Sequence, residues 1–366
     1  MSFCGRVLLV ALLAYAAVLG AARAASADVI HVFPGESIQA AIDAAEPGDT
    51  VRVHEGVYHE NVAITKNRIR LRGDGQRKTV LMPADEPTPG PCTIEVAPGV
   101  FLVDGICITG AFDPVTFELG PPVKGTRVER LHVTGFSGFG VFLLNANRST
   151  VKRVQASHNE GYGISGFVLS RVRFLDNYAH HNHEPGFYVG DSPNARAVIV
   201  GNRAHDNEMG ILLRDASRGQ VHHNRLWDNC LGVLVIETGA PDPAGRWRLR
   251  HNSVRHNNEA CEGTPTNQPP PLSGAGIVIA GADQVRVSRN KVLGHEASGP
   301  SAFTGGIVVV SSATAGGDDP NDNRIVRNTA FQNEPFDVFW DESGTGNLFR
   351  ANRCGTSDPE WICDDD

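Results

Sequence analysis

The sequence predicts an all-β fold, a single-stranded right-handed parallel β-helix with a short capping helix at its N-terminal end. Three observations carry this prediction. A motif of two asparagines and a strand-opening glycine recurs every 22–25 residues. The segments between these motifs are short, alternating and apolar, with no helical periodicity. Gly (40) and Pro (22) are abundant among the 366 residues, which favours many tight turns. Such a repeat indicates one supersecondary unit per coil, stacked on its neighbours.

Residues 1–27 have the pattern of a secretory signal peptide. Arg6 precedes an apolar run from Val7 to Gly20, and the segment ends in the cleavage-site pattern Ala25-Ser26-Ala27. The run is short for a membrane span, so we expect a secreted, extracellular protein with no stable membrane span; an uncleaved anchor is the alternative. Removing this leader leaves a formal charge of −10, which argues against nucleic acid as a partner.

A cap is expected over residues 28–50, with a helix at 37–45. Ile38, Ala41, Ile42 and Ala45 share one helical face, and Pro47-Gly48 ends the pattern. A helix there covers the open end of a stack of coils, whose first strand edges are otherwise exposed. The β-helix itself is expected over residues 51–353, followed by a C-terminal tail at 354–366.

The repeated asparagines define the coils. The first asparagine of each pair is Asn177, Asn202, Asn224, Asn252 and Asn328, and the second is Asn182, Asn207, Asn229, Asn257 and Asn333. The glycines that open strands are Gly140, Gly163, Gly186, Gly210 and Gly232. Stacked asparagines can form a ladder of amide hydrogen bonds, and asparagine tolerates left-handed turns. A propeller needs a repeat near 40 residues, and leucine-rich repeats need their own consensus.

Six cysteines remain after the leader, an even number that suggests three disulfides in an exported chain. Their clustering in the sequence favours the pairs Cys92–Cys107, Cys230–Cys261 and Cys354–Cys363. Free buried thiols are the alternative. A metal site is not expected, because no cysteine has the spacing of one.

Four insertions interrupt the coils, at residues 111–123, 238–246, 258–275 and 311–322. The third insertion and the shorter segment 297–304 precede strands, whereas the second and fourth follow strands. We therefore expect these loops to rise on opposite sides of one sheet and to wall a groove; the alternative is that they are neutral excursions of a solenoid.

Three carboxylates end consecutive strands beside this groove. Asp191, Asp215 and Glu237 are separated by 24 and 22 residues, one coil each, so they should stack about 4.8 Å apart. Like charges this close are unfavourable unless a cation or a proton is shared. We expect them to bind substrate or a Ca²⁺ ion; the alternative is a row of solvated turn residues.

Basic and proton-transferring groups adjoin these acids. Arg214 is predicted to bind the substrate and neutralise developing charge, because arginine stays protonated. Tyr188 or His183 is predicted to move the proton, and Asp215 completes the candidate catalytic set. The outward row that contains Tyr188 is mostly apolar, which suits either a platform for sugar rings or a surface covered by loops.

A stripe of imidazoles and carboxylates lies three to six residues after the first asparagine of each coil, on either side of the second asparagine. It comprises His158, Glu160, His181, His183, Asp206, Glu208, Asp228, Cys230 and His256. Such a stripe can bind a transition metal. A hydrated polar face is the alternative, because no specific ligand spacing is matched.

The segment IQAAIDAAEPGDTVRVHEGVYHENVAITKNRIRLRGDG resembles the opening of secreted right-handed parallel β-helix proteins of the pectate-lyase-like superfamily. These include polysaccharide lyases, epimerases and NosD-like periplasmic copper accessory proteins. The resemblance implies the fold, which hosts several unrelated chemistries. The DPH motif expected of alginate epimerases is absent, since Asp113-Pro114 is followed by Val115.

Three functions remain open at this stage. The first is a lyase or epimerase of an acidic, uronate-containing polysaccharide. The second is a non-catalytic glycan-binding module. The third is a metal accessory protein. This chain, however, lacks the methionine-rich or cysteine-rich ligands that Cu(I) prefers. A glycan is the expected partner of what we predict to be a monomer.

Overall fold

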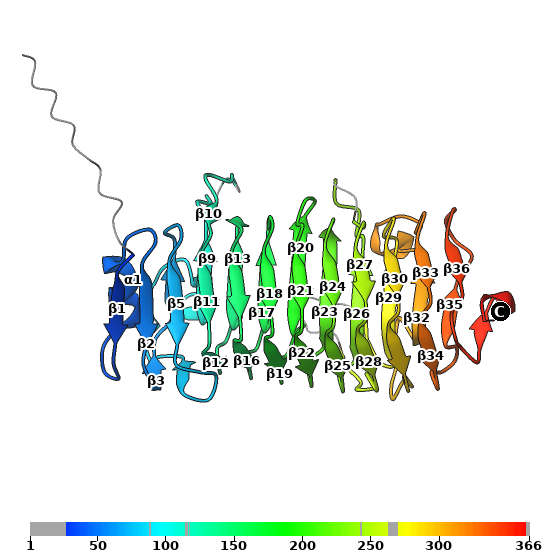
Figure 1. Ribbon diagram of the computed structural model, residues 1–366, viewed down its shortest axis with the longest axis horizontal. Coiled ribbons are helices and arrows are strands. Elements are labelled where there is room, and N and C mark those ends of the chain that lie inside the picture. Colours follow the sequence, from blue (N-terminus) through cyan, green and yellow to red (C-terminus); the bar gives the residue numbers. More distant parts are fainter. Residues whose placement is uncertain are drawn as a thin grey trace, which may run out of the picture.

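A computed structural model describes residues 27–363 except 88, 114–115, 117, 242–243 and 263–269. The predicted leader, apart from its last residue, lies outside the described residues, and so do the last three residues of the tail. The remaining chain forms a solenoid of parallel strands that runs along the long axis of the molecule (Figure 1). No helix in the described part is long and apolar enough to span a bilayer.

Each complete coil contributes one strand to each of three parallel sheets, here called sheets A, B and C, whereas the terminal coils lack some of these strands. Sheet A contains β1 (Val29–Val32), β2 (Thr50–Val53), β5 (Arg70–Gly73), β11 (Arg127–Glu129), β15 (Thr150–Lys152), β18 (Arg173–Leu175), β21 (Val198–Val200), β24 (Gln220–His222), β27 (Arg248–Arg250), β30 (Arg286–Ser288), β33 (Arg324–Val326) and β36 (Leu348–Arg350). Sheet B contains β3 (Gly56–His59), β6 (Thr79–Met82), β12 (His132–Thr134), β16 (Gln155–Ser157), β19 (Tyr178–His180), β22 (Arg203–His205), β25 (Arg225–Trp227), β28 (Ser253–Arg255), β31 (Lys291–Leu293) and β34 (Thr329–Phe331).

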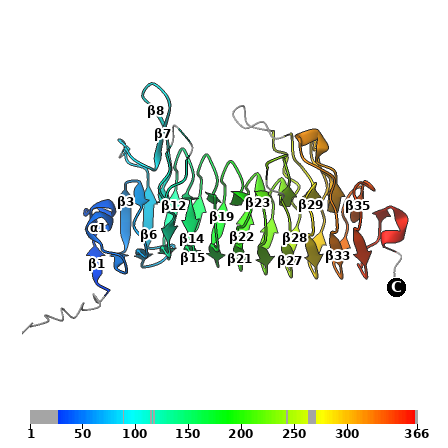
Figure 2. The ribbon, with the colours of Figure 1, turned by 90° about the horizontal axis from the view of Figure 1, so that it is seen from above.

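Sheet C, which underlies the candidate site, has the longest strands of the three. It contains β4 (Val62–Ile64), β9 (Ile106–Thr109), β13 (Val141–Leu144), β17 (Ile164–Phe167), β20 (Phe187–Ser192), β23 (Met209–Ala216), β26 (Leu231–Ile236), β29 (Ala275–Ala280), β32 (Gly305–Val310), β35 (Val338–Trp340) and β37 (Ser357–Asp358). Two short strands, β10 (Val123–Lys124) and β14 (Ala146–Asn147), pair beside it. The antiparallel hairpin of β7 (Thr93–Ala97) and β8 (Val100–Val103) stands out from the solenoid (Figure 2).

The predicted parallel β-helix is confirmed. The sheets extend beyond residues 51–353 at both ends, because β1 precedes the cap helix and β37 follows the last predicted coil. The alternating apolar residues point inward and stack in columns, so that one continuous core fills the solenoid. Burial of these columns is the main driving force for stacking the coils.

The strand-opening glycines have a steric reason. A Cβ atom at Gly163 would lie 2.7 Å from the carbonyl oxygen of Gly186, and one at Gly232 would lie 2.4 Å from that of Gly276. Any side chain there would push neighbouring coils apart, so this position requires glycine in coil after coil.

Asparagine ladders at two turns tie the coils together. Between sheets A and B, Asn202 Nδ2 donates to Asn224 Oδ1 and to the Phe174 carbonyl oxygen, both at 3.0 Å. Between sheets B and C, Asn182 Nδ2 donates to Asn207 Oδ1 at 2.9 Å. The predicted stacking of the asparagines in neighbouring coils is therefore confirmed.

One rung of the second ladder is a histidine, which the sequence pattern did not reveal. His295 occupies the position between Asn257 and Asn333. Its Nε2 lies 3.0 Å from Asn257 Nδ2, and its Nδ1 lies 2.8 Å from Asn333 Oδ1. Burial lowers the pKa of His295 to about 4, so the imidazole is neutral at neutral pH.

The helix α1 (Ile38–Ala44) covers the first coil, in agreement with the prediction for residues 37–45. Ser37 is its N-cap and accepts a hydrogen bond from the Ala40 amide. The Glu60 carboxylate accepts hydrogen bonds from the amides of Ile38 (2.7 Å) and Gln39 (3.0 Å), which anchors the helix start to the next coil.

All three predicted disulfides are present. The Cα atoms are 5.5 Å apart in Cys92–Cys107, 5.9 Å in Cys230–Cys261 and 5.4 Å in Cys354–Cys363. The last bridge joins the final coil to the 3₁₀ turn η2 (Glu360–Ile362), which follows β37 at the C-terminal end.

Candidate functional site

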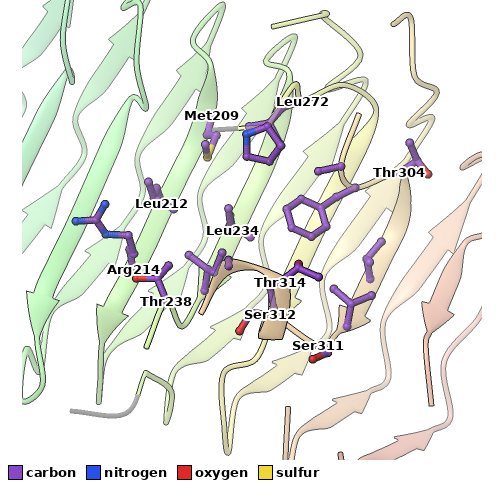
Figure 3. A pocket seen from close by; sticks show the side chains of 18 of the residues that line it. Met209, Leu212, Arg214, Leu234, Thr238, Leu272, Thr304, Ser311, Ser312 and Thr314 are labelled. Atoms are coloured by element: carbon purple, nitrogen blue, oxygen red, sulfur yellow. The ribbon is translucent and has the colours of Figure 1, made fainter. Parts of the chain in front are cut away.

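A groove with a cavity of about 660 Å³ lies on the outer face of sheet C. One wall contains Pro270 and Leu272 together with residues 302–304, which come from segments that precede strands of the sheet. The opposite wall contains Thr238 and residues 311–315, including η1 (Ala313–Ala315), which follow strands (Figure 3). The loops therefore wall the groove from opposite sides, as their positions in the sequence predict.

The floor of the groove is apolar. Leu212, Leu234 and Val308 belong to the outward row of sheet C and line the cavity. With Tyr188 and Val278 they form a second buried cluster, separate from the core. Sheet C is thus apolar on both faces, because the loops cover most of the row that a bare solenoid would expose to water.

The disulfide Cys230–Cys261 anchors one wall of the groove. Cys261 forms a pair of backbone hydrogen bonds with Leu272, of 2.9 and 3.0 Å, and Leu272 lines the cavity. Cys230 directly precedes β26 on the floor. The bridge therefore links the long 258–275 insertion to the sheet.

Arg214, at the end of β23, lines the cavity as its cationic side chain. Its Nη2 lies 3.5 Å from Asp191 Oδ2, and its Nε lies 3.7 Å from Asp215 Oδ2. Its guanidinium carbon lies 5.9 Å from the centre of the Tyr188 ring. The structure therefore brings together four of the predicted site residues, although only Arg214 among them lines the cavity.

Asp215 differs from the expectation of an open ligand that faces the groove. It is only 3% exposed, and its carboxylate accepts hydrogen bonds from the Thr238 amide (2.8 Å) and hydroxyl (2.5 Å). It therefore holds the start of the loop that follows β26. Glu237 is aligned with Asp215 in the next coil but does not line the cavity. Burial, followed by the charges of Asp283 and Asp318, raises the pKa of Glu237.

Tyr188 and His183 also lie elsewhere than predicted for proton-transfer groups. Tyr188 is fully buried, and its ring stacks on that of Tyr162 with centroids 4.6 Å apart. Burial raises the pKa of Tyr188, and its hydroxyl is a buried donor with no hydrogen-bond partner among the described residues. His183 points away to solvent with its side chain 72% exposed, 3.2 Å from the Glu160 carboxylate.

Two carboxyl groups beside the groove, the buried Glu208 and the half-buried Glu184, were not predicted as catalytic groups, although Glu208 belongs to the predicted stripe of imidazoles and carboxylates. Glu208 lines the cavity, is 8% exposed, and has its pKa raised to about 7 by burial and by the nearby charge of Glu184. Burial also raises the pKa of Glu184, whose carboxylate hydrogen-bonds the Tyr162 hydroxyl. Tyr162 lines the same cavity. A carboxyl group that titrates near neutral pH in a cleft is a typical general acid or base.

The register of sheet C explains why this pair was missed. Counted forward from the ladder asparagines, Glu208 corresponds to His183. Counted back from the aligned residues Phe187 and Ile211, Glu208 corresponds to Glu184. The coil before β20 has one extra residue in this turn, so only the count from the strands would have paired the two glutamates.

The predicted histidine stripe lies along the turn between sheets B and C. One ligand atom each from His181, His205 and Asp206 lie within 4.8 Å of one another. His181 Nε2 is 3.7 Å from Asp206 Oδ2, and His205 hydrogen-bonds both Asp206 and the Tyr178 hydroxyl. Cys230 is part of a disulfide and leaves this set.

Residues 103–197 and 193–330 match the family described as "Right handed beta helix region". Because these matches cover more than half of the sequence, the chain belongs to the right-handed β-helix family. A comparison with curated proteins found no match.

Several solved structures are similar to this chain. The A-module of the Azotobacter vinelandii mannuronan C-5 epimerase AlgE4 is 19% identical over 87% of this chain and 91% of its own, with a TM-score of 0.56. The Dettilon tailspike protein is 15% identical over 89% and 68%, with a TM-score of 0.56. The family 28 exopolygalacturonase of Yersinia enterocolitica is 11% identical over 91% and 77%, with a TM-score of 0.53. At these identities the likeness establishes the fold alone.

Proposed function

We propose that this chain binds a polysaccharide in the groove above sheet C and acts on it as a lyase or epimerase of a uronate-containing glycan. The cavity has the size and the largely apolar lining of a small-molecule site, with several polar side chains distributed around it. Phe303, Phe336 and Phe339 also line it and offer ring faces on which the apolar sides of sugars can pack. Two similar structures are named for the polyuronates mannuronan and polygalacturonan, which supports this choice of substrate.

The observation that carries the proposal is the combination of Glu208 with Arg214 in one cavity. The carbon next to a uronate carboxylate is the acidic position of the sugar. Arg214 lies near the far end of β23 from Glu208 and supplies a permanent positive charge that binds a carboxylate elsewhere on the polymer. Glu208, with its pKa raised to about 7 by burial, is suited to remove the proton at neutral pH.

In the proposed reaction, the ionised Glu208 accepts the C5 proton of one sugar unit, while Arg214, near the other end of β23, pairs with the carboxylate of another unit of the same polymer. For a lyase, the electrons of the C5–H bond form a C4–C5 double bond, the C4–O4 bond breaks, and the leaving oxygen takes a proton from Tyr162. For an epimerase, Tyr162 gives its proton to the opposite face of C5. Burial raises the pKa of Tyr162, so its hydroxyl retains a proton to donate.

The Ca²⁺ site predicted at Asp191, Asp215 and Glu237 is untested, and the arrangement of these side chains fits a calcium ion poorly. Asp191 faces Arg214, and Asp215 is buried against Thr238. Ca²⁺ needs six to eight oxygen ligands, which these side chains and Glu237 do not bring to one place. We therefore derive the chemistry without a metal ion and expect EDTA to leave turnover unchanged.

Polymers of uronic acids, incubated with the protein and followed by absorbance of unsaturated products and by NMR of sugar configuration, test the proposal. Arg214→Ala and Glu208→Gln should each lower turnover about 100-fold or more, whereas Glu160→Gln, on the exposed side of the turn, should not. Binding in the groove without turnover would favour a non-catalytic glycan-binding module. The absence of both binding and turnover would refute the proposal.

A second candidate function is metal handling, favoured by the His181, His205 and Asp206 cluster. Imidazole and carboxylate ligands suit Zn²⁺, Ni²⁺ or Cu²⁺. Zn²⁺ titration followed by calorimetry tests this function, with His181→Ala as the variant that must abolish the heat of binding. We also propose that the protein is exported, which its three disulfides support.

A further inference from the structure

Arginines concentrate on sheet A, away from the groove. From β2 to β36, each strand of this sheet is preceded, two positions earlier, by a residue with positive φ. From β5 to β36 these residues are Arg68, Gly125, Arg148, Arg171, Arg196, Arg218, Arg246, Gln284, Asp322 and Gly346. Arginine therefore occupies this position in five consecutive coils, from β15 to β27. The strands pair side by side in this order (Figure 1), so the five arginines occupy the same position in neighbouring coils and form a column.

The backbone geometry makes this choice of residue informative. Left-handed φ values suit glycine, asparagine and aspartate, and other residues adopt them at a cost of about 1 kcal/mol. At the turn between sheets B and C, the chain uses aspartate, glycine, glutamine and histidine, and at the turn between sheets A and B arginine occurs in no more than two consecutive coils. Arginine in five consecutive coils is therefore not explained by the turn itself, which indicates a role for its charge.

Three members of the arginine column, Arg196, Arg218 and Arg246, border a groove on the outer face of sheet A. Two adjoining hollows of about 860 and 440 Å³ share Gln220, Arg246 and Arg248 in their linings. Eight arginines line the two hollows: Arg196, Arg218, Arg246, Arg248, Arg250, Arg286, Arg289 and Arg324. The single carboxylate in these linings, within the described part of the chain, is Asp322.

These arginines lack acidic partners within the protein. Among the described residues, no carboxylate oxygen lies within 4.0 Å of any of the eight guanidinium groups. The neutral contacts are Arg196 with Asn194 at 3.0 Å and Arg246 with Gln284 at 3.2 Å. The chain as a whole has a formal charge of −8, yet these unpaired cations gather on one face, where they repel one another. An anionic ligand would relieve that repulsion.

We propose that the outer face of sheet A binds an acidic polysaccharide along the axis of the solenoid. The arginines of the lining span five coils, from β21 to β33, which is about 19 Å at about 4.8 Å per strand. That length matches several units of a polymer rather than one small anion. Guanidinium groups bind carboxylates through paired hydrogen bonds.

A glycan fits this face better than a nucleic acid does. No aromatic residue lines either hollow in the described part of the chain, whereas proteins that bind single-stranded nucleic acid stack its bases on aromatic rings. The glycan identity of the ligand rests on the proposed function. The two sites lie on different sheets, so this surface would hold the polymer while the groove above sheet C acts on it.

The test is calorimetric binding of polygalacturonate at low salt, with neutral dextran as the uncharged polymer. The variant is Arg246→Gln/Arg248→Gln/Arg286→Gln. Glutamine is tolerated at these positions, because Gln284 and Gln220 occupy the equivalent sites in neighbouring coils. The matched control is Arg225→Gln/Arg255→Gln/Lys291→Gln, which removes the same charge from exposed positions on sheet B.

We expect the sheet A variant to bind polygalacturonate about tenfold more weakly than wild type, and the sheet B control to bind within about twofold of it. Binding should weaken further as salt rises. Equal losses in the two variants, or equal binding of neutral dextran, would overturn the inference. A DNA duplex that binds as tightly as polygalacturonate and is lost with the same arginines would overturn the assignment to a glycan.

Two further measurements separate this inference from the proposed function. The sheet A variant should still turn over a short oligouronate that fits the groove, because its substitutions lie on another sheet. Conversely, Arg214→Ala should retain binding of the polymer to sheet A. If no polyuronate is turned over but the sheet A variant loses polymer binding, the proposed function fails and the inference stands.

Discussion

Replacing Glu208 by glutamine should stabilise the protein in a pH-dependent way. The pKa of Glu208 is raised from 4.5 to about 7, chiefly by burial. Between these values the unfolded chain releases its proton while the folded chain retains it, so stability falls as pH rises. The loss is complete above pH 7 and amounts to about 3 kcal/mol, at 1.36 kcal/mol per pKa unit. Glutamine has the same shape and carries no charge.

The assay is urea unfolding of the wild type and of Glu208→Gln across this pH range. At pH 8.5 the variant should be more stable by about 3 kcal/mol, and at pH 4 the two proteins should be about equally stable. Glu160→Gln, with its side chain 67% exposed two coils earlier, is the control and should change stability little at either pH. A gain in Glu208→Gln that is the same at pH 4 and pH 8.5 would refute the reasoning.

Three further predictions concern the scaffold. Asn202→Ala removes a buried ladder amide and should cost about 3 kcal/mol in urea unfolding, against less than about 0.5 kcal/mol for the exposed Asn194→Ala. Because burial lowers the pKa of His295 to about 4, stability should fall by about 3 kcal/mol as pH drops from 6.5 to below 4, and His295→Asn should abolish that fall in unfolding measurements at pH 3.5 and 7. Cys230→Ser with Cys261→Ser should lower the free energy of unfolding by about 3 kcal/mol in calorimetry; unchanged stability would mean that the bridge adds nothing.

The scaffold was accessible from the sequence because it repeats. Asn182, Asn207 and Asn229 recur at one phase, because each coil needs the same amide at the same turn. The period of the sequence therefore predicts the repeating fold directly. The capping helix and the loop walls followed from local patterns in the same way. His295 was not predicted as a rung of the ladder, because a single histidine replaces the repeated asparagine and fulfils its hydrogen-bonding role.

The candidate site was less accessible because tertiary contacts decide it. Tyr188 lies in the outward row as expected, but loops distant in sequence cover it. Asp215 is diverted from the groove by Thr238, and that bond depends on how the following loop starts. Glu184 and Glu208 are brought into register by one extra turn residue, a detail that asparagine spacing alone conceals.

The closed ends of the solenoid restrict how such a protein can change its length. At one end Glu60 fastens α1 across the first coil, and at the other Cys354–Cys363 fastens the last. A coil added outside the Glu60–α1 contact or the Cys354–Cys363 disulfide would place that contact within the solenoid, where it would no longer close an end. Insertion or deletion of whole coils is therefore confined to the middle, where each coil presents the same surfaces above and below. Lineages of this protein should differ in the number of central repeats while retaining both terminal devices.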